Sequence, residues 1–197
     1  MQVKYQHIIK KWTNNQSFDE KIITLFKKVR DIPYGTIGSR NPLDVYHQNM
    51  GTCSGKHALL KALYVELGLE VKDFIVMHNF NKLPIKYPKN IQKIILENRI
   101  IDPHNFIKIK RGNQWFTVDV TWDKGLKKLG FPMNENWDGK SNLAILVAYE
   151  GKIFETVDPI ALKKEFLQKL PNKNQKERIV FIKKLTKWLS SERELTK

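Results

Sequence analysis

Cysteine is almost absent from this sequence, since Cys53 is the only one among 197 residues. A single cysteine excludes an internal disulfide, so nothing in the chain calls for an oxidising compartment. The sequence also lacks an apolar run long enough to cross a bilayer, and its first residues, MQVKYQHIIKKW, contain no signal-peptide core. We therefore expect a cytoplasmic protein that has no membrane partner.

Acidic residues are scarce relative to basic ones: 20 Asp and Glu against 35 Lys and Arg give a net charge of +15. This balance indicates either an anionic partner, such as a nucleic acid, or simply a lysine-rich surface. Arginine, the usual residue for bidentate contacts to phosphates and bases, supplies only six of these cations. No zinc-finger spacing or RNP-like aromatic motif accompanies the charge, so a basic nucleic-acid-binding protein is an alternative to the interpretation developed below.

Hydrophobic residues make up 41% of the chain, enough for a sizeable core. We expect residues 1–157 to form one domain and residues 158–197 to form a C-terminal helical extension packed on it. The expected elements are a helix over 18–30, a strand over 71–78, a short helix near 91–96, a hairpin over 104–121, a second hairpin made of LAILVAY and IFETV around EGK, and two tail helices, PIALKKEFLQKL and ERIVFIKKLTKWLSSER.

Cys53 lies in the segment GTCSGKHALLKALYVELGLE, where apolar residues recur at helical spacing and Gly68 is a natural stop. The spacing predicts a helix that begins within a residue or two of Cys53. The positive end of a helix lowers the pKa of a thiol, and the thiolate is the nucleophilic form. Gly51 and Gly55 would leave space for a substrate carbonyl, and the Cys53 N–H would donate to the oxyanion. A buried structural cysteine is the alternative.

The hairpin is predicted where HNFIKIK and WFTVDVT, which both alternate, flank the turn-like RGNQ. With a two-residue loop at 112–113, His104 and Asp119 share one face of the sheet as diagonal neighbours about 7–8 Å apart at Cα. A slip of one residue would put them on opposite faces. An aspartate between Val118 and Val120 costs stability unless it has a partner. A carboxylate here would hold the imidazole in one tautomer and stabilise the imidazolium.

Taken in chain order, GTCSGKHALLKAL and PHNFIKIKRGNQWFTVDVTWD resemble the transglutaminase-like superfamily. Phe106 matches an aromatic residue that follows the family's histidine, and Trp115 matches a tryptophan shortly before its aspartate. The resemblance covers residues 18–125. It implies an α+β fold with a papain-like core, in which the helix that carries the cysteine packs on an antiparallel sheet. It also implies acyl transfer or amide hydrolysis through a thioester. The extra β-domains and calcium loop of animal transglutaminases are not visible.

The oxyanion donor of such an enzyme is not fixed by this sequence. Gln48, five residues before Cys53, and Trp122 are candidates for oxyanion or substrate contacts, and Trp12 is a third. Each of these residues is also well suited to a structural role.

Two further alternatives concern the residues around the cysteine and the histidine. Asp102 and Asp123 are other candidates for the acid, but the hairpin aims Asp119 at His104. His57 lies four residues after the cysteine on the same helical face and would suggest a metal pair, but no further ligand cluster accompanies it.

We therefore predict a cysteine-dependent amide or ester hydrolase, or acyltransferase, that acts on a protein or peptide and needs no cofactor or metal. Cys53 attacks the carbonyl, His104 takes the thiol proton and later protonates the leaving amine, and Asp119 orients His104. Hydrolysis is favoured over crosslinking because nothing in the sequence indicates how water is excluded. The alternative is a non-catalytic binding module of the same fold, in which the sulfur would be sealed in apolar packing. The oligomeric state is left open.

Overall fold

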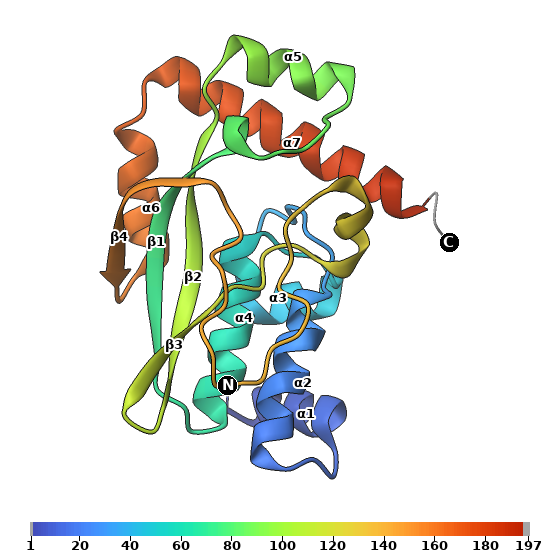
Figure 1. Ribbon diagram of the computed structural model, residues 1–197, viewed down its shortest axis with the longest axis vertical. Helices are drawn as coiled ribbons and strands as arrows, with labels where there is room; N and C mark the ends of the chain where they lie inside the picture. The colour runs from blue at the N-terminus through green and yellow to red at the C-terminus, as the bar shows by residue number, and fades with distance from the viewer. Residues whose placement is uncertain (1, 195–197) are drawn as a thin grey trace.

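The structure is a computed structural model that describes residues 2–194, with side chains from residue 4 onward. It combines one sheet with helices on its sides and across one end (Figure 1). The elements in chain order are α1 (Gln2–Thr13), α2 (Phe18–Arg30), α3 (Pro42–Gln48), α4 (Cys53–Glu66), β1 (Val71–Asn79), η1 (Phe80–Lys82), α5 (Lys89–Glu97), β2 (Ile101–Arg111), β3 (Gln114–Val118), η2 (Lys124–Leu129), β4 (Tyr149–Thr156), α6 (Pro159–Gln168) and α7 (Asn172–Glu194).

The sheet has four strands in the order β3-β2-β1-β4, and all its pairs are antiparallel. In the hairpin, Arg111 lies opposite Gln114 and Ile107 lies opposite Val118. This is the register that a two-residue loop at 112–113 predicts, so the hairpin prediction is confirmed. The α+β class is confirmed as well.

The prediction of a second hairpin is wrong. β4 is a single strand that continues through the expected EGK turn and pairs with β1 at the edge of the sheet. Gly151, with φ of +77°, accommodates a register shift between Ile75 and Met77, so the chain bulges there instead of reversing. The segment 143–147, which was expected to be a strand, runs as an irregular segment across the core.

The helices form two hydrophobic cores on different parts of the sheet. On one face, Ile107, Ile109 and Val118 pack with buried residues of α1, α2 and α4. The opposite face carries a smaller cluster that includes Phe74 and Phe106. The second large core joins α5, α7 and the segments after β1 and β3, and Figure 1 shows α7 crossing beside α5 beyond the ends of β1 and β2.

The helix over 18–30 is confirmed, and a capping box fixes its start. The Ser17 hydroxyl accepts a hydrogen bond from the Glu20 N–H, while the Glu20 carboxylate accepts one from the Ser17 N–H at 2.8 Å. Both tail helices are confirmed as α6 and α7, whereas α1 was not predicted. Within residues 2–194, no helix combines the length and the apolar character that spanning a bilayer requires.

Candidate active site

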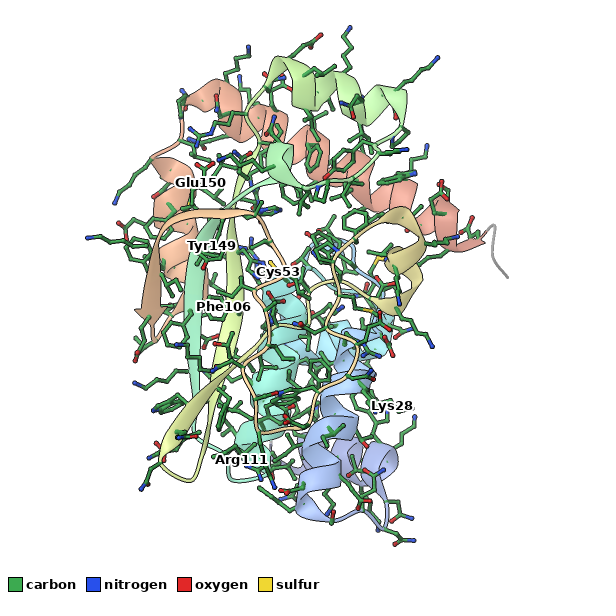
Figure 2. All side chains as sticks on the ribbon, in the orientation of Figure 1. Lys28, Cys53, Phe106, Arg111, Tyr149 and Glu150 are labelled. Atoms are coloured by element: carbon green, nitrogen blue, oxygen red, sulfur yellow. The ribbon has the colours of Figure 1, made fainter. Side chains whose placement is uncertain are left out.

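Cys53 is the first residue of α4, as the helical spacing predicted. Figure 2 shows it at the end of α4 that lies in the middle of the molecule, beside the sheet. Thr52 caps the helix with an extended backbone and without a side-chain hydrogen bond. The N–H groups of a first helical turn have no carbonyl one turn earlier to bind, so they present partial positive charge around the sulfur.

The two flanking glycines allow close packing of α3 on α4. A Cβ atom on Gly51 would lie 2.9 Å from Cγ1 of Val45, and one on Gly55 would lie 2.8 Å from Cγ2 of the same residue. Both distances are shorter than side chains tolerate. The glycines are therefore explained by the approach of Val45, and not by space for a substrate carbonyl as the sequence analysis expected.

His104 and Asp119 meet across the end of the hairpin. His104 Nε2 donates to Asp119 Oδ2 at 2.8 Å, and both side chains are buried. The other carboxylate oxygen, Oδ1, accepts from the N–H and the hydroxyl of Thr121 at 2.9 and 2.6 Å. The N–H of Leu146, in the segment that was expected to be a strand, donates to Oδ2 at 3.0 Å. Four hydrogen bonds therefore fix this carboxylate.

These contacts set the charge of both groups. Burial raises the pKa of Asp119, but the charge and hydrogen bond of His104 outweigh burial and hold that pKa well below its usual range. Burial lowers the pKa of His104, but the Asp119 carboxylate and the interaction with Cys53 raise it to about 9. The pair is therefore a carboxylate and an imidazolium at neutral pH.

The Cys53 sulfur is buried among charged groups and not in apolar packing. Burial raises the pKa of the Cys53 thiol, but the Lys163 ammonium, a hydrogen bond with His104 and the charge of His104 lower it to about 6. Because Nε2 of His104 is held by Asp119, the ring's other nitrogen, Nδ1, is the one free to face the sulfur. With pKa values of about 6 and about 9, the proton shared by this pair lies on the imidazole at pH 7.

Lys163 reaches this site from α6 and was not predicted from the sequence. Its Nζ lies 3.8 Å from Cys53 Sγ and donates to Ser54 Oγ at 2.9 Å. It also lies 3.7 Å from Asp102. No local signal distinguishes this buried lysine from the exposed Lys164 that follows it. The tail was expected to contribute packing or partner contacts, but it also brings a cation to the cysteine.

Asp102, an alternative for the acid beside the histidine, is engaged elsewhere. Its Oδ1 accepts from Arg178 of α7, through Nε at 2.5 Å and through Nη2. Burial raises the pKa of Asp102, but Lys163 and Arg178 outweigh burial and lower it to about 2. The other alternative, Asp123, binds Arg193 and accepts from the N–H of Tyr34.

His57 is a neutral spacer between α4 and the hairpin. Its Nδ1 donates to the Cys53 carbonyl at 2.7 Å, and its Nε2 accepts from the Val120 N–H at 3.0 Å. Burial lowers its pKa to about 4. The His57 ring is therefore neutral at pH 7, and its Nε2, 3.5 Å from Asp119 Oδ1, does not form an ion pair. Both ring nitrogens are used, so neither is available to the metal pair considered from the sequence.

The three candidate oxyanion donors lie in different parts of the structure. Trp122 is buried, and its Nε1 already donates to the Leu146 carbonyl at 2.7 Å. Gln48 is exposed at the last residue of α3. Trp12 lies on α1, with its ring 5.3 Å from that of Tyr46. The structure brings none of these three into contact with Cys53 among the interactions of residues 2–194.

A cavity of about 250 Å³ opens next to the site. Its lining comes from the loop before α3, the start of α4, β2, α6 and α7: Tyr34, Thr36, Gly38, Ser39, Arg40, Thr52, Asp102, Lys163, Arg178, Ile179, Ile182 and Lys183. Cys53 is only 3% exposed. Lys163 lines the cavity, and its Nζ lies 3.8 Å from the sulfur, so this side chain connects the cavity with the buried Cys53.

Comparisons with known proteins add little to this geometry. No family model matches the chain, and no curated protein matches it. Three solved chains match, and one of them, from Cytophaga hutchinsonii, is described as "a Putative Cysteine Protease". The two are 16% identical, with a TM-score of 0.43, and the match covers 79% of this chain and 48% of that one. This chain thus aligns with about half of the matched chain.

Proposed function

We propose that this protein is a cysteine hydrolase or acyltransferase of the transglutaminase-like kind, in which Cys53 is the nucleophile, His104 the general acid and base, and Asp119 the residue that orients His104. One observation carries the proposal. Lys163 Nζ lies 3.8 Å from the buried Cys53 sulfur, and His104, which also interacts with that sulfur, binds the Asp119 carboxylate at 2.8 Å. These neighbours lower the thiol pKa to about 6, below the imidazole pKa of about 9, so the resting form at pH 7 is a thiolate beside an imidazolium. A structural cysteine in apolar surroundings would have a raised pKa instead.

The reaction follows from these charges. The Cys53 thiolate attacks an amide or ester carbonyl carbon, an S–C bond forms, and the carbonyl electron pair moves to oxygen. The tetrahedral intermediate collapses as the C–N or C–O bond breaks, and the imidazolium of His104 gives its proton to the leaving group. The product of this half-reaction is a thioester on Cys53.

The second half restores the enzyme. Neutral His104 removes a proton from water, or from an acceptor amine, as its oxygen or nitrogen attacks the thioester carbonyl. The thiolate then leaves and the acid or new amide is released. Throughout both halves the Asp119 carboxylate keeps Nε2 of His104 protonated, so that Nδ1 carries the proton that moves.

The oxyanion has two candidate partners in the structure. The N–H of Cys53 lies in the unpaired first turn of α4. Lys163 Nζ lies 3.8 Å from the sulfur. In this proposal its ammonium stabilises first the thiolate and then the oxyanion that forms next to it. Lys163 thereby takes the role for which Gln48 and Trp122 were candidates from the sequence.

Acylation by an activated ester tests the proposal directly. Incubation with p-nitrophenyl acetate is expected to give a burst of nitrophenolate and one acetyl group on Cys53, located by peptide mass spectrometry. Cys53→Ala should lose the burst, and His104→Ala should slow it strongly. If the native protein and Cys53→Ala were acetylated to the same extent, and on lysines only, the site would perform no nucleophilic catalysis.

The alternative is a non-catalytic binding module, and the 3% exposure of Cys53 favours it. The charged neighbours of the sulfur favour the enzyme instead. The acetylation experiment separates the two, because a sealed sulfur would stay unmodified while the protein is folded and react only after denaturation.

A further inference from the structure

The cavity beside Cys53 is strongly cationic. Four of its lining side chains, Arg40, Lys163, Arg178 and Lys183, carry positive charge, against the single carboxylate of Asp102. That carboxylate is already shared, because Arg178 binds its Oδ1 and Lys163 lies 3.7 Å from its Oδ2. The only carboxylate of the lining is therefore already paired with cations of the same lining.

Two of these cations have no partner in the part of the chain that the structure describes. The side chains of Arg40, in the loop before α3, and Lys183, on α7, make no hydrogen bond or ion pair within residues 2–194, and both are exposed where they line the cavity. Basic residues without an acidic partner are common in a chain with a net charge of +15, and these two are distinguished by their position in the lining of the cavity beside Cys53. The unpaired cations thus come from two segments far apart in sequence and meet at one cavity.

We propose that this cavity binds an anionic group of the substrate, a carboxylate close to the carbonyl that Cys53 attacks. The inference rests on the proposed function and narrows its substrate to acyl groups or peptides that carry an acidic side chain or a free terminal carboxylate. Arg40 and Lys183 hold the carboxylate at the mouth, and Lys163, at the inner end, faces the reacting carbonyl. Ile179 and Ile182 add apolar wall for the carbon chain between the two groups. At about 250 Å³ the cavity fits a short segment of substrate.

Two alkylating reagents of nearly equal size test the charge preference. Iodoacetate carries a carboxylate and iodoacetamide is neutral, and both alkylate the same sulfur. In Arg40→Gln/Lys183→Gln, the second-order rate constant for iodoacetate is expected to fall by about fivefold, while that for iodoacetamide changes much less. The ratio of the two rate constants in the native protein should also fall as salt is added, since screening weakens the attraction.

The matched control is Lys86→Gln/Lys152→Gln, which removes the same charge from two exposed lysines outside the cavity. The ratio in this variant should equal that of the native chain. An equal fall of this ratio in both variants would overturn the inference, because the preference would then come from the net charge of the whole protein. No fall of the ratio in either variant would overturn it as well, because Arg40 and Lys183 would then not attract the carboxylate.

A binding measurement keeps the inference separate from the proposed function. Backbone amide shifts of residues 36–40 are followed by NMR during titration with N-acetylglutamate and, in parallel, with neutral N-acetylglutamine. Shifts with the first compound only, lost in Arg40→Gln/Lys183→Gln, would support the anion site even if Cys53 proved unreactive. Equal responses to both compounds, or none, would refute it even if Cys53 proved catalytic.

Discussion

Lys163 Nζ lies 3.8 Å from Cys53 Sγ, although 110 positions separate the two residues in the chain. The lysine comes from α6, in the C-terminal part of the chain, and the cysteine begins α4. In the proposed mechanism, thiolate formation at Cys53 therefore depends on a residue outside the segments that resemble the transglutaminase-like superfamily. The cation and the His104 ring together overcome the burial that would otherwise keep the sulfur protonated.

Removal of this cation should raise the pKa of Cys53. In Lys163→Met, which keeps the chain length and loses the charge, we expect the pKa of the thiol to rise by about 1 unit or more, because an opposite charge at this distance shifts a pKa by that order. The measurement is the pH dependence of Cys53 alkylation. Lys164→Met removes an exposed lysine of the same helix and serves as the control. The same midpoint in both variants would show that Lys163 does not set the charge of the sulfur.

The Asp119 carboxylate should matter strongly to the reaction. Asp119→Asn removes the charge that holds Nε2 of His104 protonated, so the pKa of His104 should fall and acylation by p-nitrophenyl acetate should slow by about 10³- to 10⁴-fold. Asp73→Asn, which changes another buried carboxylate that binds Lys61, is the matched control. Comparable acylation rates in the two variants would remove Asp119 from the mechanism.

Close packing around the start of α4 gives a stability prediction. Gly51→Ala places a Cβ against the stiff Val45 side chain, and we expect the free energy of unfolding in urea to fall by about 1–3 kcal/mol. Val45→Ala alone should also destabilise the protein, by leaving a cavity. The double variant should lose clearly less free energy of unfolding than the sum of the two single losses, because the added methyl group of residue 51 fills space that Val45→Ala leaves empty. Strict additivity would mean that the two residues do not touch.

Asp102 predicts how stability falls in acid. Its pKa is about 2 in the folded protein and near 3.8 when unfolded, so the unfolded chain binds the proton first as pH falls. The depressed pKa contributes about 2 kcal/mol above pH 4, and this contribution is lost as pH falls toward 2. Urea unfolding of the native protein and of Asp102→Asn from pH 2 to pH 6 should therefore give curves that converge in acid. If the difference in free energy of unfolding between the two proteins did not change with pH, the ion pairs of Asp102 with Lys163 and Arg178 would be contradicted.

The hairpin shows how much of the site the sequence determines. Two alternating segments around a two-residue loop allow one favourable register, and that register brings His104 and Asp119 together. The start of α4 was equally predictable, because apolar residues recur at helical spacing from just after Cys53. These are local rules, and they were sufficient for the part of the site built from neighbouring elements.

Long-range packing decided the rest. Lys163 and Lys164 are alike in sequence, and only the docking of α6 buries one of them against Cys53. The segment 143–147 has a strand-like composition, but its backbone binds site residues instead: the Leu146 N–H donates to Asp119. Gly151 was interpreted as a turn, yet it allows a bulge that depends on β1 as a partner. Periodicity along the chain contains none of this information.

Cys53 should be a thiolate at neutral pH because His104 and Lys163 stabilise it. The most direct measurement is the rate of Cys53 alkylation by iodoacetamide from pH 4 to pH 10, followed by intact-protein mass spectrometry, in the native protein and in His104→Ala. We predict a midpoint near pH 6 in the native protein, in line with the thiol pKa of about 6, and a higher midpoint in His104→Ala. A midpoint at the ordinary thiol value of about 8.5 that is unchanged in His104→Ala would contradict the account.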